Sequence, residues 1–164
     1  MDARKVETGS VTDTTDREII TTRIINAPRE LVWNAFTDPD ALAQWWGPNG
    51  FTLTTKVFEF KAGGDWIFVM HGPDGRDYAN LVHFTEIVRP LRMLHDHGGD
   101  DGKVMFKASI TLDEIDGGTR VTMRSVFNSK EVRDFVTKEY GAVEGGKQTL
   151  ARLDTYVTEN RTNG

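Results

Sequence analysis

Apolar and polar residues alternate, or recur at helical spacing, along almost the whole chain, and the first clear pattern lies at residues 18–25. This segment is rich in isoleucine and threonine, which favour strands. Pro28 then suits a first helical position, and the apolar residues behind it recur every three to four positions. Asp38 ends that helix, because a residue before proline avoids the α region. A second short helix, residues 39–45, ends before Gly47, so the pattern predicts a strand, two short helices and another strand.

The clearest hairpin is predicted around the Asp-Gly pair at residues 116–117, which lies between two alternating segments. A two-residue turn there places Phe106 opposite Phe127 on an apolar face. Asp113 and Arg120 then face each other on the opposite side of the hairpin. One apolar and one charged face from a single register support that register.

Two further hairpins are predicted upstream, with turns at residues 72–75 and 90–91. We carry the alternation through both turns without an inserted residue. The more apolar face, which we place inward, then holds Trp66, Phe68, Met70, Ala79, Leu81, His83, Thr85, Ile87, Leu94 and Asp96. His95 and His97 fall on the outer face. A β-bulge in either hairpin would exchange the two faces downstream of it.

Residues 129–160 are predicted to form a long amphipathic helix, with Ser129 as its N-cap and one broad apolar stripe. Gly145 and Gly146 interrupt its middle, where each glycine costs about 1 kcal/mol relative to alanine. Gly146 falls near the inward stripe, so its missing side chain would leave space between helix and sheet. A kink or break near Gly141 is the alternative interpretation.

Several short motifs along these elements resemble the Bet v 1/START-like (SRPBCC) superfamily, and within it the family named after the C-terminal domain of the Hsp90 ATPase activator. The motifs are Ala27-Pro28, Val32-Trp33, Ala35, Asp38-Pro39, Leu42, Trp45-Trp46-Gly47-Pro48, Gly63-Gly64-Asp65-Trp66, Gly72-Pro73-Asp74-Gly75, Glu86-Ile87-Val88-Arg89-Pro90 and Gly145-Gly146. The resemblance covers nearly all of residues 17–157. It implies an α+β helix-grip fold, in which a curved antiparallel sheet wraps around a long C-terminal helix and two short helices follow the first strand. Residues 1–16 are polar, rich in Thr and Asp and without periodicity, so we expect a disordered leader there and a single domain at residues 17–160.

A strongly curved sheet and one helix enclose a space that only large side chains can fill, and an apolar cavity with a few polar groups is the usual form of a small-molecule site. We therefore predict that the protein binds a hydrophobic small molecule between sheet and helix. The predicted ligand-binding residues are Trp46, Trp66, Phe68, Met70, Leu81, His83, Thr85, Asp96, Phe106, Met123, Ser125, Phe127, Tyr140 and Gly146. Trp45, next to Trp46, is expected to close the core instead, because large aromatic side chains dominate core packing.

Catalysis and metal binding are weighed at two groups of side chains. His83 and Asp96 share the predicted inner face, where such a pair could act as general acid and base. Some members of the superfamily are cyclases or dehydratases, so the resemblance makes an enzyme of that kind an alternative function. No nucleophile-plus-base pattern or phosphate loop accompanies the pair, and we assign no catalytic residue and no cofactor. His95 and His97 share a strand face with Glu86 but lack the ligand spacing of a zinc site, so no metal is predicted.

Composition narrows the function classes further. The chain has 164 residues, no cysteine, a net charge of −5 and no Lys/Arg cluster. The acidic balance disfavours general nucleic-acid binding, and the absence of cysteine suits a reducing cytoplasm. The longest apolar run, residues 66–70, is far too short to span a membrane, and the first residues lack the pattern of a signal peptide.

The expected partner is therefore a hydrophobic small molecule, with no nucleic acid and no membrane. The resemblance implies a second function class, an Hsp90-associated co-chaperone or stress-response interaction protein. We expect no activation of Hsp90 by this chain alone, because it has no room for the activator's separate N-terminal domain. A homodimer and another protein partner are left open.

Overall fold

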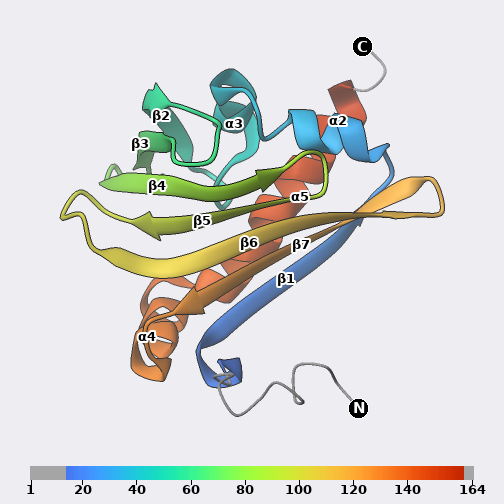
Figure 1. The fold of residues 1–164 in the computed structure, drawn as a ribbon. Helices are drawn as coiled ribbons and strands as arrows, with labels where there is room; N and C mark the ends of the chain where they lie inside the picture. The colour runs from blue at the N-terminus through green and yellow to red at the C-terminus, as the bar shows by residue number, and fades with distance from the viewer. Residues whose placement is uncertain (1–13, 161–164) are drawn as a thin grey trace.

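The computed structural model describes residues 14–160, which form a seven-stranded antiparallel sheet bent around a long helix (Figure 1). The strands are β1 (Glu18–Ile25), β2 (Thr52–Phe58), β3 (Asp65–His71), β4 (Asp77–Val88), β5 (Arg92–Gly98), β6 (Val104–Ile115) and β7 (Gly118–Phe127). The helices are η2 (Thr15–Arg17), α2 (Arg29–Asn34), α3 (Pro39–Trp45), α4 (Lys130–Tyr140) and α5 (Ala142–Asn160). The strand order is β1-β7-β6-β5-β4-β3-β2. This architecture confirms the predicted α+β helix-grip fold.

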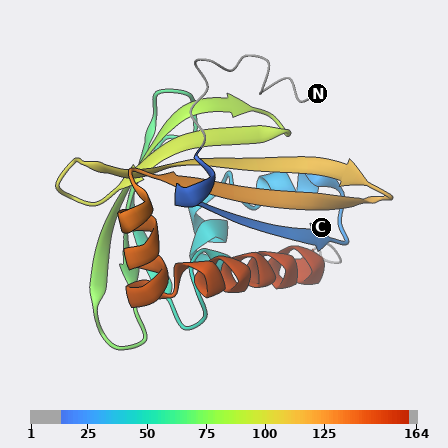
Figure 2. The same ribbon diagram turned by 90° about the horizontal axis from the view of Figure 1, so that it is seen from below.

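The helices cover the sheet from one side and from two ends. The short helices α2 and α3 lie at the opposite end of the sheet from α4 (Figure 1). Figure 2 shows α4 and α5 on the same side of the sheet, with α4 turned sharply away from the axis of α5. Most of the predicted leader, residues 1–13, lies outside the described residues. Its last part is ordered as η2, and Arg17 Nη1 donates to the Phe127 carbonyl oxygen at 2.9 Å.

The predicted hairpin of β6 and β7 is confirmed residue by residue. Phe106 lies opposite Phe127, and Asp113 lies opposite Arg120. The turn between them consists of Asp116 and Gly117, which both adopt positive φ angles. An Asp-Gly pair accepts that backbone conformation more readily than other residues, which is why the sequence signal was specific here.

The predicted faces are wrong for β5 and for β4 before Thr85, because both upstream loops have an odd number of residues, whereas Ile87 packs against the core as predicted. His71 pairs with Asp77, which leaves residues 72–76 in the first loop, and Val88 pairs with Arg92, which leaves residues 89–91 in the second. A bulge at Thr85 shifts the register once more. Each change of one residue moves the following side chains to the other face. The inner face consequently holds Val82, Phe84, Met93, His95 and His97.

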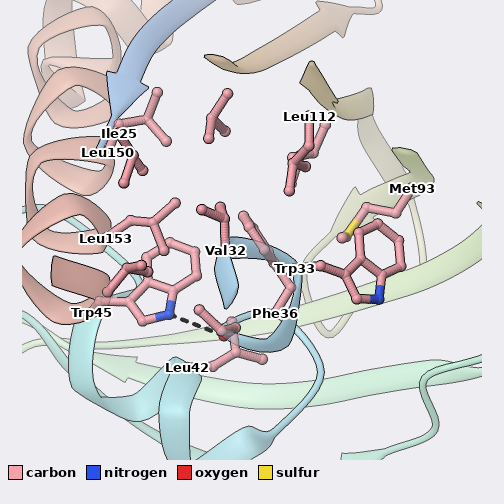
Figure 3. Close-up of a cluster of buried hydrophobic side chains, with 14 of the residues drawn as sticks. Ile25, Val32, Trp33, Phe36, Leu42, Trp45, Met93, Leu112, Leu150 and Leu153 are labelled. Carbon is pink, nitrogen blue, oxygen red and sulfur yellow. Dashed lines mark hydrogen bonds between the residues drawn. The ribbon is translucent and has the colours of Figure 1, made fainter. Parts of the chain in front are cut away.

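The hydrophobic core lies between the sheet, α5 and the two short helices (Figure 3). Trp45 is completely buried in it, as predicted. Its indole N–H donates to the Ala35 carbonyl oxygen at 3.1 Å, and its ring meets the edge of Phe36 at a centroid distance of 4.9 Å. Leu150 and Leu153 bring α5 into the same cluster. Trp45 thus joins the end of α3 to both α2 and α5.

The C-terminal helix is not continuous, and the alternative of a break near Gly141 is confirmed. Ser129 caps α4, its hydroxyl accepting from the Val132 N–H at 3.1 Å. Gly141 ends α4 in the left-handed conformation, with φ 61° and ψ 41°, and its N–H donates to the Val136 carbonyl oxygen. Helix α5 begins at the next residue, so the break sets the angle between α4 and α5.

Replacing Gly141 with alanine is expected to lower the free energy of unfolding by about 1 kcal/mol, because a Cβ disfavours the left-handed conformation. No neighbour lies within 4 Å of the position that a Cβ would take, so the effect is one of backbone conformation alone. Urea denaturation monitored by circular dichroism measures it. Gly141→Asn is the matched control, because asparagine adopts this conformation more easily and should lose less. Equal losses in the two variants would contradict the explanation.

Candidate ligand pocket

A cavity of about 270 Å³ lies between the sheet and the junction of α4 and α5. Its lining consists of Ile19, Thr21, Met105, Phe106, Met123, Ser125, Phe127, Val136, Ala142 and Gly146. These residues come from β1, β6 and β7 on one side and from the two helices on the other. The lining is apolar apart from two hydroxyl groups, and it contains no charged side chain. This character is typical of small-molecule sites, and the volume is close to the lower end of their usual range.

Strand register explains why the lining residues of the sheet share one face. Ser125 on β7 is directly opposite Ile19 on β1 and Ala108 on β6. Phe106 and Phe127 form the neighbouring pair in the same direction along the strands. Directly opposite residues of antiparallel strands point to the same side of the sheet. The confirmed register of β6 and β7 therefore positions the floor of the cavity.

The helix side of the cavity depends on a close approach at Gly146. A Cβ on Gly146 would lie 2.8 Å from Oγ1 of Thr21, so α5 can approach β1 this closely only without a side chain there. Val136 of α4 is buried at the cavity, whereas Met105 of β6 is 45% exposed. The cavity is thus closed by α4 and α5 and open to solvent beside Met105.

The structure brings together a subset of the predicted ligand-binding residues in this cavity: Phe106, Met123, Ser125, Phe127 and Gly146. They belong to β6, β7 and α5, which are separated in sequence but adjacent in the fold. The hairpin signal at residues 116–117 and the paired glycines of α5 were the features that identified them.

The predicted aromatic residues of β3, with Trp46 directly after α3, form a packed cluster elsewhere in the interior. The rings of Trp66 and Phe68 stack with centroids 3.8 Å apart, and Trp46 meets the edge of Trp66 at 5.1 Å. The space beside them, bounded also by His95, amounts to only about 10 Å³. Met70 packs against the same core. These side chains fill the interior and do not line the open cavity.

Two groups of predicted site residues lie outside the interior, and these predictions are corrected. Leu81, His83, Thr85 and Asp96 are on the outer face, because of the loop lengths and the bulge described above. There, Nδ1 of His83 lies 2.7 Å from Oδ1 of Asp65, while Asp96 accepts from Nζ of Lys107 at 3.0 Å. Tyr140 is 60% exposed, because α4 ends beside it instead of continuing along the sheet. The proposed acid/base pair of His83 and Asp96 therefore does not face the cavity.

The functional candidates that sequence reasoning placed on the wrong face are His95 and His97, which are buried. Burial lowers the pKa of His95 to about 4 and that of His97 to about 3, and repulsion between the two rings contributes to the second shift. Both imidazoles are therefore neutral at pH 7. Their ring centroids are 5.7 Å apart, and His97 stacks on Phe106 at 4.7 Å. Phe106 lines the cavity, so the histidines lie directly behind its wall.

A larger groove, of about 650 Å³, runs between α3 and α5 and is polar. Arg152, which lines it, donates from Nη1 to the carbonyl oxygens of Gly47 and Pro48 at 2.9 and 2.8 Å. These bonds hold the segment after α3 against α5, and they account for Arg152 structurally. Across residues 14–160, no three His, Cys, Asp or Glu side chains are grouped as a metal site requires.

The fold and the cavity define a helix-grip protein of the Bet v 1/START-like class. The family model described as "Activator of Hsp90 ATPase homolog 1-like protein" matches residues 26–158, and the chain belongs to this family. Curated proteins gave no match. Within the described part of the chain, no helix is both long and apolar enough to cross a membrane.

Solved structures from several bacteria share the fold. A protein from Arthrobacter aurescens is 28% identical, with a TM-score of 0.80, over 91% of this chain and 90% of its own. A Mycobacterium smegmatis protein is 26% identical, with a TM-score of 0.79, over 92% and 96% of the two chains. A Nitrosomonas europaea protein is 24% identical, with a TM-score of 0.81, over 92% and 99%, which is a likeness of fold alone.

Proposed function

We propose that the protein binds a neutral, largely apolar small molecule in the cavity between β1, β6, β7 and the junction of α4 and α5. The observation that carries the proposal is an apolar cavity of about 270 Å³, without charged groups, at a place where the sheet and the helices do not close on each other. Filling such a space with an apolar molecule removes apolar surface from water. Each Å² of apolar surface buried in this way contributes about 25 cal/mol of favourable free energy.

The arrangement of the helices supports access to this cavity. Helix α4 buries one side chain, Val136, and the break at Gly141 separates it from α5. Met105 and Phe135, both large and apolar, are 45% and 55% exposed. A molecule can therefore enter beside Met105 without displacing α5, whose Leu150 and Leu153 are anchored in the core.

A titration with 2-methoxynaphthalene, a neutral aromatic probe without hydrogen-bond donors, tests the proposal. We expect amide chemical shifts of Met123, Ser125 and Gly146 to move together in NMR spectra as the probe is added. Native mass spectrometry of the protein purified from its own host complements it by showing which molecule the cavity carries.

Replacing Ser125 with leucine should fill part of the cavity and weaken probe binding about tenfold, which corresponds to 1.4 kcal/mol. Ser109→Leu is the matched control. Ser109 lies on the neighbouring strand opposite Arg124, so it is on the outer face of the sheet. This variant should bind the probe as the unmodified protein does. Shifts confined to other surfaces, or equal binding by both variants, would contradict the proposed site.

We rank two other functions below this one. The role of an Hsp90-associated co-chaperone rests on the family description alone, whereas the cavity is a feature of this chain. Catalysis by His83 and Asp96 ranks last, since these side chains point away from the cavity.

A further inference from the structure

The buried histidines carry polar atoms that the fold leaves without partners. Nδ1 of His95 and Nδ1 of His97 are inaccessible to solvent and have no hydrogen-bond partner among the described residues. Buried polar atoms in native proteins are nearly always paired, and an orphaned one requires a specific explanation. The two atoms belong to neighbouring rings, whose centroids are 5.7 Å apart, so one explanation should account for both.

The tautomer of His97 follows from its neighbour Asn80. Nδ2 of Asn80 donates to the Tyr78 carbonyl oxygen at 3.0 Å, which fixes the orientation of the amide because a carbonyl can only accept. Oδ1 of Asn80 therefore faces Nε2 of His97, at 2.8 Å. That contact requires the hydrogen of the neutral ring on Nε2. Nδ1 of His97 is consequently a bare acceptor, and it needs a donor.

The ring of His95 can supply the complementary group. No hydrogen bond among residues 14–160 fixes its tautomer, so its Nδ1 can donate or accept. Burial keeps the pKa of both rings far below 7, so neither presents a positive charge at that pH. A neutral acceptor beside a neutral donor matches a hydroxyl group, which donates one hydrogen bond and accepts others.

The two imidazoles do not line the cavity themselves, but they lie on β5, the strand next to its floor. Ser125, in the cavity lining, is opposite Ala108, and Ala108 is in turn opposite His95. Two strand spacings, about 10 Å, separate Ser125 from His95, and the side chain between them is only a methyl group. The neighbouring row across the same three strands consists of Phe127, Phe106 and His97. In this row the ring of Phe106 stacks on the ring of His97. A ligand in the cavity can therefore reach the histidines only if the Phe106 ring rotates aside.

We propose that the ligand is a neutral apolar alcohol or phenol whose ring or chain occupies the cavity and whose hydroxyl group donates to Nδ1 of His97 and accepts from Nδ1 of His95. This inference rests on the proposed function and names the ligand class for the same site. A carboxylate is excluded from the class for two reasons. It has no hydrogen to donate at neutral pH, and the lining offers no cation to offset its burial.

Three probes that share a naphthalene ring and differ in the group at position 2 test the inference at pH 7. They are 2-naphthol, 2-methoxynaphthalene and naphthalene-2-carboxylate. We expect 2-naphthol to bind about tenfold more tightly than its methyl ether, since only the phenol can donate, and the carboxylate to bind more weakly than either. With ¹⁵N-labelled histidine, the Nδ1 resonance of His97 should report an unprotonated nitrogen in the free protein. It should move when 2-naphthol binds and stay in place when the ether binds.

His97→Phe provides the variant, because phenylalanine keeps a ring against Phe106 and removes the acceptor. In this variant the tenfold preference for 2-naphthol should fall below twofold. His83→Phe, on the outer face, is the matched control and should keep the preference. If His97→Phe does not fold, the ¹⁵N measurement on the unmodified protein decides.

The outcomes separate the two proposals. Binding of the phenol and the ether with equal affinity, without movement of the His97 Nδ1 resonance, would overturn the hydroxyl inference and leave the cavity as a binding site. Failure of all three probes to shift Met123 and Ser125 would overturn both.

Discussion

Replacing Trp45 with alanine is expected to lower the free energy of unfolding by about 3–5 kcal/mol, the range for deleting a large buried aromatic side chain. Trp45 is 0% exposed, and its indole N–H is the donor to the Ala35 carbonyl oxygen. Its removal would open a cavity where α2, α3 and α5 meet, and it would leave that buried carbonyl without this partner. Because domains are stable by only about 5–15 kcal/mol, such a loss brings the fold close to unfolding at room temperature.

Chemical denaturation with a two-state analysis measures this loss in the free energy of unfolding. Two further variants serve as comparisons. Trp45→Phe keeps an aromatic ring against Phe36 but loses the hydrogen bond, so it should fall between alanine and the unmodified protein. Phe135→Ala removes an aromatic ring that is 55% exposed and should cost less than 1 kcal/mol. A loss below 1 kcal/mol for Trp45→Ala would show that the cluster closes without the indole.

Local sequence signals predicted the elements in which one residue type dictates the backbone. Pro39 follows Asp38 at the start of α3, and the carboxylate of Asp38 caps the helix by accepting from the Asp40 N–H at 2.9 Å. Asp116 and Gly117 fixed the β6–β7 register because a two-residue turn leaves no freedom in the pairing. Those signals located Phe106, Met123, Ser125 and Phe127 correctly on the inner face.

The faces of β4 and β5 could not be predicted, because they depend on parity. The loop at residues 72–76 contains the motif Gly-Pro-Asp-Gly, but Arg76 also belongs to the loop, with its carbonyl oxygen accepting from the Gly72 N–H at 2.7 Å. The bulge at Thr85 contains no glycine, so the sequence gives no signal of it. An error of one residue moved His83 and Asp96 inward in the prediction and His95 and His97 outward. The prediction thus placed two surface side chains, His83 and Asp96, in the interior and two interior side chains, His95 and His97, on the surface.

Acidification should destabilise the protein strongly because of the same two buried histidines. Their pKa values in the folded protein, about 4 for His95 and about 3 for His97, lie below the ordinary value of 6.5 that holds in the unfolded chain. The unfolded chain therefore binds more protons between these limits, and stability falls as the pH falls below 6.5. From pH 7 to pH 5, each histidine should lower the free energy of unfolding by about 2 kcal/mol, or about 4 kcal/mol for the pair.

This pH window lies above the ordinary titration of Asp and Glu side chains, so urea denaturation at pH 7, 6 and 5 isolates the histidines. His95→Phe and His97→Phe should each remove about half of the pH dependence, because phenylalanine fills the buried position without binding a proton. His83→Phe is the control, since His83 lies on the outer face beside Asp65. It should leave the loss attributed to the buried pair intact. If the two buried variants keep the full pH dependence of the unmodified protein, then His95 and His97 are protonated in the folded state near pH 6, and they are not the neutral imidazoles on which the hydroxyl inference depends.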